Sequence, residues 1–259
     1  MNRPARSRAP GLSLVHDNIV RCTRCDRLRS YCQQIAREKR AAYRAETYWG
    51  RPVPGFGDPQ ARVLVLGLAP AAHGANRTGR VFTGDGIGGS GDFLMRAMHA
   101  TGFASIPTSR RIDDGLALHD AFISAVVRCA PPDNKPSPQE IAACEEHLTA
   151  EVAALSRVRV IVCLGRVAFD AAWRLLARQG LPSIRPKPTF SHGAVYHPDD
   201  TYTVIGSYHP SRQNTNTGRL TPEMLAEIFR TAAESRLSPQ SRRERSGAPN
   251  RRGGGAPRL

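Results

Sequence analysis

Four short runs rich in apolar and β-branched residues recur along the chain, and segments with helical periodicity separate them. Turn residues bound each run, as is typical of strands buried on both faces of a sheet. The runs span residues 63–66, 122–127, 159–164 and 201–208. Because right-handed helical crossovers join parallel strands, this alternation predicts a mainly parallel sheet with helices on both faces.

The segments between these runs carry local signals for helix ends. Ser137-Pro138-Gln139-Glu140 is a capping box with proline at the first helical position. Ser90 is a candidate cap for another helix, which Gly102 would end. Helices are expected at about residues 13–20, 28–43, 91–101, 138–155, 165–179 and 222–236. The predicted fold is therefore α/β, a three-layer α/β/α sandwich around a four-stranded, mainly parallel sheet.

A long loop follows the first run and interleaves glycines with polar side chains. Its polar residues are His73, Asn76, Arg77, Arg80 and Asp85. Open α/β sheets bind their ligands in loops that follow the carboxyl ends of strands. A mobile surface loop is the alternative, but the apolar residues at positions 81 and 82 favour an ordered one. We therefore expect the functional site in this loop.

The charge of the chain indicates a class of partner. The net charge is +15, of which residues 236–259 supply seven Arg and one Glu, and residues 1–10 supply three Arg. The rest of the chain is still basic, which favours a polyanionic partner such as nucleic acid, although a genome biased toward Arg would give the same excess. Residues 1–11 and 237–259 lack hydrophobic periodicity and are expected to be disordered. One domain over residues 12–236 remains.

No apolar run approaches the length of a membrane span, and no signal-peptide core follows the first arginines. We therefore expect a cytoplasmic protein that does not bind a membrane. In that compartment, six cysteines indicate metal ligands or buried thiols rather than disulfides.

The spacing of the cysteines leaves the metal open. Two residues separate Cys22 from Cys25, but fourteen separate Cys129 from Cys144, whereas structural zinc sites normally use two tight pairs. Four thiolates can also hold an iron–sulfur cluster without such spacing, and a protein without metal is the third possibility. Of the two remaining cysteines, the one at position 163 is expected in the core, and Cys32 is expected there or as an alternate ligand.

Three blocks of sequence resemble the family-5 uracil-DNA glycosylases, often called type B. The blocks are Gly67–Ala71 with Arg77–Arg80 and Phe82–Asp85, then Arg128–Pro132 with Asn134–Pro136, and finally Tyr208–Thr215 with Thr217–Leu220. The similarity runs from about Cys22 to about Ala233. It implies a monomeric DNA repair enzyme that hydrolyses the N-glycosidic bond of uracil in double-stranded DNA, without lyase activity. The abasic product would pass to downstream abasic-site repair enzymes.

The resemblance also implies a cofactor. It assigns a 4Fe-4S cluster to Cys22, Cys25, Cys129 and Cys144, each of which matches its place in the family's pattern. Such a cluster would tie the N-terminal helical segment to the rest of the domain.

Cleavage of this bond creates a cationic sugar and an anionic base, which two kinds of side chain can stabilise. His209 is the candidate hydrogen-bond donor to the base, because it follows the last strand on the ligand side of the sheet. Asp85 is the candidate carboxylate that positions or deprotonates water and faces the sugar. A Gly-Asp-Gly sequence also forms structural Asx turns, and His209 could equally be a core or surface histidine.

Other residues are expected to contact the flipped base. The resemblance implies that Phe82 stacks on it and that the amide of Asn134 reads the O4 and N3–H edge of uracil. From the residues alone, Phe82 could be a loop anchor, and Asn134 would be a turn residue before Lys135-Pro136. Ala69 stands where classical uracil-DNA glycosylases have an Asp and can do no acid–base work, so the resemblance to family 5 assigns the carboxylate to Asp85. His73 and Asn76 are weaker alternatives. Ala71 leaves the C5 edge of the base open, which predicts excision of 5-hydroxymethyluracil and hypoxanthine as well as uracil. Residues expected to grip phosphates are Arg77, Ser211, Arg212, Asn214 and Arg219.

Two other functions remain possible from the sequence. A nucleotide-binding enzyme with a doubly wound sheet is disfavoured, because neither a Gly-x-Gly-x-x-Gly motif nor a Walker lysine follows the first strand. A non-catalytic iron–sulfur DNA-binding module would need neither Asp85 nor His209. The side chain that fills the gap left by a flipped base is not evident from the sequence.

Overall fold

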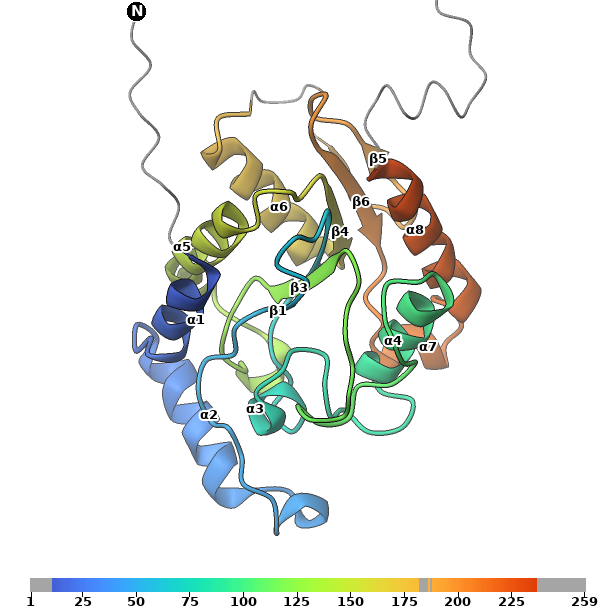
Figure 1. Ribbon diagram of the computed structural model, residues 1–259. Helices are drawn as coiled ribbons and strands as arrows, with labels where there is room; N and C mark the ends of the chain where they lie inside the picture. Colours follow the sequence, from blue (N-terminus) through green and yellow to red (C-terminus); the bar gives the residue numbers. More distant parts are fainter. Residues whose placement is uncertain (1–10, 182–185, 187, 237–259) are drawn as a thin grey trace, which may run out of the picture.

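The computed structural model describes residues 11–181, 186 and 188–236, and its centre is a six-stranded sheet (Figure 1). The strand order is β1-β3-β2-β4-β6-β5. The four central strands are parallel and fully buried: β2 (Val63–Gly67), β3 (Ala121–Ala125), β4 (Val160–Leu164) and β6 (Thr203–Ser207). They confirm the four strands expected from the sequence.

The prediction of four strands in all was wrong, because each edge of the sheet carries one more. β1 (Phe56–Gly57) pairs antiparallel with β3, and β5 (Val195–Tyr196) pairs antiparallel with β6. Each has two residues, which is too short for a recognisable pattern of alternation. The sheet is therefore mixed, with a parallel centre and antiparallel edges.

The side chains of the parallel strands alternate between two cores. Leu64 and Leu66 of β2 lie in one cluster of buried residues, and Val63 and Val65 lie in the other. This two-residue period places each core on one face of the sheet. The sequence pattern correctly predicted that both faces are covered.

Helices from different parts of the chain cover the two faces (Figure 1). α5 (Pro138–Ala154) and α6 (Arg166–Arg178) supply residues to the first core, and α4 (Ser90–Ala100) and α8 (Pro222–Ser235) supply residues to the second. α1 (Leu12–Val20) packs on α5, and α2 (Asp26–Glu38) follows it. No helix in this described part of the chain is long and apolar enough to span a membrane.

Helix ends agree with local sequence signals in some places and differ in others. Both hydrogen bonds of the capping box between Ser137 and Glu140 are present at α5. Ser90, however, is the first residue of α4, and Gly89 is its N-cap. The N-cap therefore lies one residue before the position expected from the sequence. α2 ends at Glu38, well before residue 43, and a 3₁₀ turn, η1 (Ala41–Tyr43), follows.

Three short helical turns lie inside loops that the sequence pattern left without structure. They are α3 (Ala75–Thr78), η2 (Pro132–Asn134) and α7 (Arg212–Asn216). All three follow parallel strands, so they shape the carboxyl edge of the sheet. The expected disorder of residues 1–11 and 237–259 concerns residues that, apart from Gly11, lie outside the described part of the chain.

Candidate active site at the carboxyl edge of the sheet

Parallel pairing brings the carboxyl ends of the central strands to one edge of the sheet. Gly67 at the end of β2 pairs with Ala125 at the end of β3, and Leu164 of β4 pairs with Ser207 of β6. The loops after β2, β3 and β6 therefore meet at this edge. They surround a pocket of about 780 Å³.

The pocket gathers most of the residues expected at the site. From the loop after β2 it is lined by Leu68, Ala69, Ala71, Ala72, His73, Gly74, Ala75, Phe82, Gly84, Asp85, Gly89 and Ser90. From the other two loops it is lined by Pro131, Asp133, Asn134, His209, Ser211, Arg212 and Gln213. Tyr31 of α2, Tyr43 of η1 and Arg40 between them also reach it, and nothing in the sequence pattern had pointed to these three.

Asp85 lies in the pocket with its carboxylate turned toward the protein. A Cβ placed on Gly74 would come within 1.9 Å of Asp85 Oδ1, so only glycine leaves room for this carboxylate. Burial raises the pKa of the Asp85 carboxyl to about 6, although the Gly91 backbone N–H, Arg212 and Arg77 act to lower it. A carboxyl group that loses its proton just below neutral pH is well suited to act as a general base.

His209 lines the same pocket from the loop after β6 and is uncharged. Burial lowers the pKa of its imidazole to about 4, so the ring is neutral at pH 7. A neutral imidazole still carries one N–H and can donate one hydrogen bond. Its main chain is fixed by Asn214, whose Nδ2 donates to the His209 carbonyl oxygen at 2.8 Å, and by the Ser211 N–H at 2.8 Å.

Phe82 brings the loop after β2 into contact with His209. Its ring stacks on the His209 ring with centroids 5.8 Å apart and an interplanar angle of 30°. Its backbone has φ of 51°, a left-handed conformation that is unusual for an aromatic residue. The ring also lies against Gly67, where an added Cβ would be 2.7 Å from Cε2. The structure therefore holds Phe82 in a defined position at the end of β2.

Two weaker candidates for the catalytic carboxylate's role have other partners. The Nδ1 atom of His73 is 3.1 Å from the Tyr48 hydroxyl, and burial together with Arg40 and Arg77 lowers the pKa of this ring. Asn76 is fully buried, and its Nδ2 donates to the Cys32 carbonyl oxygen at 3.2 Å. Asp85 is thus the best-placed of the three to act on water in the pocket.

The expected phosphate contact of Arg77 is not supported by its position. The side chain is 6% exposed, and its guanidinium pairs with Glu46 and lies 3.9 Å from the centroid of the Tyr43 ring. It also donates to the carbonyl oxygens of Gly84 at 2.8 Å and His73 at 2.9 Å. Arg77 therefore braces the loop that carries Asp85, and a phosphate contact of this residue stays a prediction that its inward position does not favour.

The other residues expected at phosphates occupy the outer side of the site. Ser211 caps α7 by accepting from the Asn214 N–H at 3.4 Å. Arg212 is exposed, and its Nη2 is 3.4 Å from the Asp85 carbonyl oxygen. The guanidinium of Arg219 lies 4.5 Å from the centroid of the Tyr208 ring. Arg212 and Arg219 are the two cations of this set that remain available to DNA.

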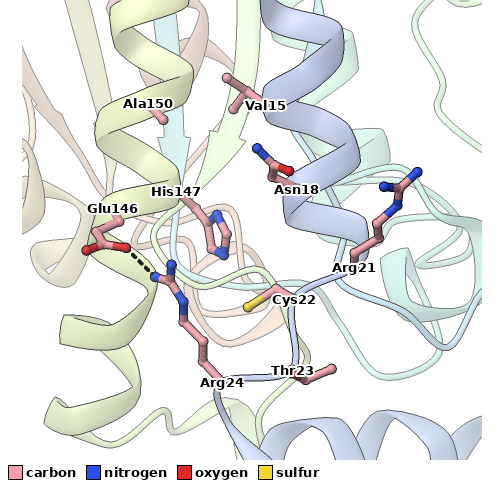
Figure 2. Close-up of a pocket in the computed structure, with 9 residues that line it drawn as sticks. All are labelled: Val15, Asn18, Arg21, Cys22, Thr23, Arg24, Glu146, His147 and Ala150. Carbon is pink, nitrogen blue, oxygen red and sulfur yellow. Dashed lines mark ion pairs between the residues drawn. The ribbon is translucent and has the colours of Figure 1, made fainter. Parts of the chain in front are cut away.

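A second pocket, of about 450 Å³, lies between α1 and α5 beside the first of the expected cluster ligands (Figure 2). Cys22 and His147 both line it, and Arg24 pairs with Glu146 at 2.6 Å along its border. His147 is 8% exposed, and its Nε2 atom is buried without a hydrogen-bond partner. Such an orphan donor or acceptor is unusual in a folded protein.

The four expected ligands lie near one another although they come from three segments. Burial raises the pKa of the Cys25 thiol, and the neighbouring thiols of Cys144, Cys129 and Cys22 add to this rise, which reaches about 11. Burial and the neighbouring thiols therefore make it costly for Cys25 to lose its proton. A bound cation would offset that cost by stabilising the thiolate. In the described ranges no three Cys, His, Asp or Glu side chains converge tightly enough for a single metal ion.

The other two cysteines are buried. Cys163 lies on β4 in the core, as expected. Cys32 on α2 donates to the Ala130 carbonyl oxygen at 3.6 Å, and its hydrogen bond with Cys129 raises the pKa of the Cys129 thiol. Cys32 is thus a neighbour of one expected ligand, which the spacing of the cysteines could not show.

The fold and this site define a class of protein. The family model of the uracil DNA glycosylase superfamily matches residues 54–233, and the chain belongs to that superfamily. Among its relatives are type-5 uracil-DNA glycosylases. That of Thermus thermophilus is 49% identical over 215 residues, covering 83% of this chain and 93% of the relative. Those of Mycobacterium tuberculosis and Pyrobaculum aerophilum are 49% and 43% identical, over 82% and 84% of this chain and 76% and 90% of their own lengths.

Proposed function

We propose that this protein is a DNA repair glycosylase that hydrolyses the N-glycosidic bond of uracil in double-stranded DNA and leaves an abasic site. Its membership of the superfamily and its type-5 relatives support the reaction. The assignment of the reaction to this pocket rests on one observation: Asp85 and His209 both line it. One offers a carboxyl group with pKa about 6, and the other offers a neutral imidazole.

The pocket divides the reaction between these two side chains. Asp85 holds and deprotonates the attacking water, and its negative charge stabilises the sugar as the bond to the base lengthens. His209 donates its N–H to the oxygen of the departing base, where negative charge develops. Because the imidazole is already neutral, it acts as a hydrogen-bond donor and does not need to lose a proton first.

The base is held by the residues around these two. Phe82 offers an aromatic face for stacking, and Asn134 offers the amide that pairs with O4 and N3–H of uracil. Ala69 and Ala71 line the same pocket with methyl groups only, so neither supplies acid–base chemistry. The open C5 edge beside Ala71 extends the proposed substrates to 5-hydroxymethyluracil and hypoxanthine.

The enzyme is proposed to stop at the abasic site. A lyase step needs an amine nucleophile, and the residues that line the pocket include no lysine. The product would therefore pass intact to abasic-site repair enzymes. That the protein acts as a monomer is proposed from its family resemblance alone.

A 4Fe-4S cluster is the proposed cofactor, held by Cys22, Cys25, Cys129 and Cys144. The donor set is all thiol, and the four ligands of a cluster bind different irons, so they stand farther apart than the ligands of one ion. When bound, the cluster would link the segment at the start of α2 to the loop after β3 and to α5. The orphaned Nε2 of His147 beside Cys22 offers a hydrogen bond to such a group.

The experiment that tests this function uses duplex oligonucleotides with a single uracil. Purified protein should release uracil and leave a site that alkali cleaves, with no cleavage before alkali. An identical duplex with cytosine in place of uracil is the control. Binding of the uracil duplex without release of the base would instead support a non-catalytic iron–sulfur DNA-binding module.

A further inference from the structure

A basic segment, residues 37–44, borders the pocket where α2 ends and η1 follows. It contains four cations and one acid, and three of the cations are exposed arginines: Arg37, Arg40 and Arg44. The end of α2 and η1 project beyond the rest of the domain on the side where α3 and α7 lie (Figure 1). Arg40 lines the pocket itself. The basic segment therefore lies beside the proposed active site.

The exposed arginines of the basic segment lack the acidic partners that arginines on α6 and α8 have. On α6, for example, Arg174 pairs with Glu145 at 3.0 Å. In the described ranges, none of the three exposed arginines of the basic segment pairs with an acid. The two nearest acids are engaged elsewhere, since Glu38 accepts from a glutamine one turn earlier at 2.8 Å and Glu46 pairs with Arg77. Cations this close in sequence repel one another, so their grouping calls for an explanation.

Contacts with α3 fix the position of the basic segment relative to the loop after β2. The Tyr43 ring lies against the Arg77 guanidinium, 3.9 Å from its centroid. Just after the segment, the Trp49 N–H donates to the Arg77 carbonyl oxygen at 2.9 Å, and the Gly50 N–H donates to the Asn76 carbonyl oxygen at 3.0 Å. The charges of the segment therefore keep a defined place beside the pocket.

The phosphate backbone of DNA is the partner that this arrangement fits. A flipped nucleotide stays joined to the duplex through its flanking phosphates, so these phosphates pass beside the residues that line the pocket. A guanidinium offers several N–H donors to phosphate oxygens and keeps its charge at any physiological pH. Arg40 lines the pocket from the basic segment and Arg212 lines it from the loop after β6, so two separate elements present cations there.

Resting on the proposed function, we propose that the basic segment binds the phosphate backbone of the duplex beside the flipped nucleotide, in addition to the loop after β6. The contact carries no sequence information, because every base pair has the same phosphates. Its contribution to affinity falls with salt, because each neutralised phosphate releases counterions. Arg37 and Arg44 do not line the pocket, so the excision step itself does not depend on them.

The test measures binding of a duplex that carries a tetrahydrofuran analogue of the abasic site, between about 50 and 200 mM KCl. Arg37→Ala and Arg44→Ala should each lower the slope of log affinity against log salt by about 0.9, the value for one phosphate contact. Arg37→Lys and Arg44→Lys should keep the wild-type slope, because the charge remains. Arg157→Ala is the matched control, since this exposed arginine precedes β4 at the opposite, amino edge of the sheet, and it should also keep the slope.

Excision separates this surface from the proposed active site. At saturating protein, the alanine variants should release uracil at the wild-type single-turnover rate, because neither arginine touches the reacting atoms. An unchanged slope in both alanine variants, an equal fall in Arg157→Ala, or an equal fall in the lysine variants overturns the proposal. Wild-type protein that binds the duplex but releases no uracil would overturn the proposed function alone, and the slopes would still decide whether the basic segment binds DNA.

Discussion

At the scale of single residues, burial shifts the pKa values of two side chains in the site in opposite directions. Burial raises the pKa of Asp85 and lowers the pKa of His209, because each group resists becoming charged away from water. Well above pH 6, the pocket therefore holds one carboxylate and one neutral imidazole. This is the combination that the proposed hydrolysis requires, and glycine at position 74 leaves room for the carboxylate.

Asp85→Asn should lower single-turnover excision by about 100- to 10,000-fold, the range for a lost general base. In the wild type the rate should rise as pH increases through about 6, where Asp85 loses its proton, and then level off. The variant should lack this rise. The measurement is the rate on uracil duplex between pH 4.5 and 8.5, and a wild-type profile in Asp85→Asn would contradict the assignment.

The same substitution should make the folded protein more stable at neutral pH. The raised pKa means that the folded state holds the Asp85 proton more tightly than the unfolded state does. The carboxylate therefore costs stability once pH exceeds its unfolded value, by up to about 3 kcal/mol for a rise of this size. The gain in Tm of Asp85→Asn should be larger at pH 8 than at pH 4, and an equal gain at both would contradict it.

Ala71→Tyr should narrow the range of substrates toward uracil. A ring at this position would fill the space beside C5, where 5-hydroxymethyluracil carries its substituent. The check is excision from matched duplexes that contain uracil, 5-hydroxymethyluracil or hypoxanthine. A wild-type enzyme confined to uracil would show that the methyl group of Ala71 does not leave the pocket open.

At the scale of elements, a buried network joins segments that the sequence does not bring together. Glu151 of α5 is fully buried and accepts from Arg128 at 2.8 Å, from Ser124 Oγ at 2.5 Å and from the Gly55 N–H at 2.9 Å. His16 Nε2 of α1 lies 3.4 Å from it. Arg128 precedes Cys129, so this network holds the helices against the strand that leads to an expected cluster ligand.

Glu151→Gln should destabilise the protein by about 3–5 kcal/mol, because the buried charge of Arg128 would lose its partner. Burial alone would raise the pKa of Glu151, but Arg128, His16, Ser124 and Gly55 lower it to about 2. The network therefore contributes stability above the usual Glu pKa, and this contribution is lost as pH falls toward 2. Urea unfolding at pH 7 measures the loss, and the exposed Glu234→Gln is the control. An unchanged midpoint in Glu151→Gln would refute this role.

The elements also show what the sequence could and could not predict. Signals that lie within a few residues were reliable: the capping box at Ser137 is present, and four buried runs are the four parallel strands. Two-residue edge strands and helices of four or five residues are too short to show a period, so they were missed. Arg77 looks in the sequence like any basic loop residue, but its burial depends on Glu46 and Tyr43, which only the fold places beside it.

At the scale of the whole molecule, the proposed cluster would connect the N-terminal segment to the domain. Protein purified without air should be brown and contain about four iron and four sulfide per chain, as the formula of the cluster requires. Cys25→Ser should lose the colour and lower the stability of the fold, whereas Cys163→Ser should keep the iron. Stoichiometric zinc without visible absorbance in the same preparation would reject the cluster.

The strand order has a consequence for how the chain reaches this structure. β2 occupies the middle of the sheet, and Val63 pairs with both Ala121 and Val160. Contacts this distant in sequence make folding slow, because long stretches of chain must be ordered before they form. During synthesis, the apolar β2 segment therefore lacks one of its two neighbouring strands until β4 has left the ribosome, and incompletely paired segments tend to aggregate. Expression at low temperature should therefore raise the soluble yield, because it gives the strands more time to pair before the chains aggregate.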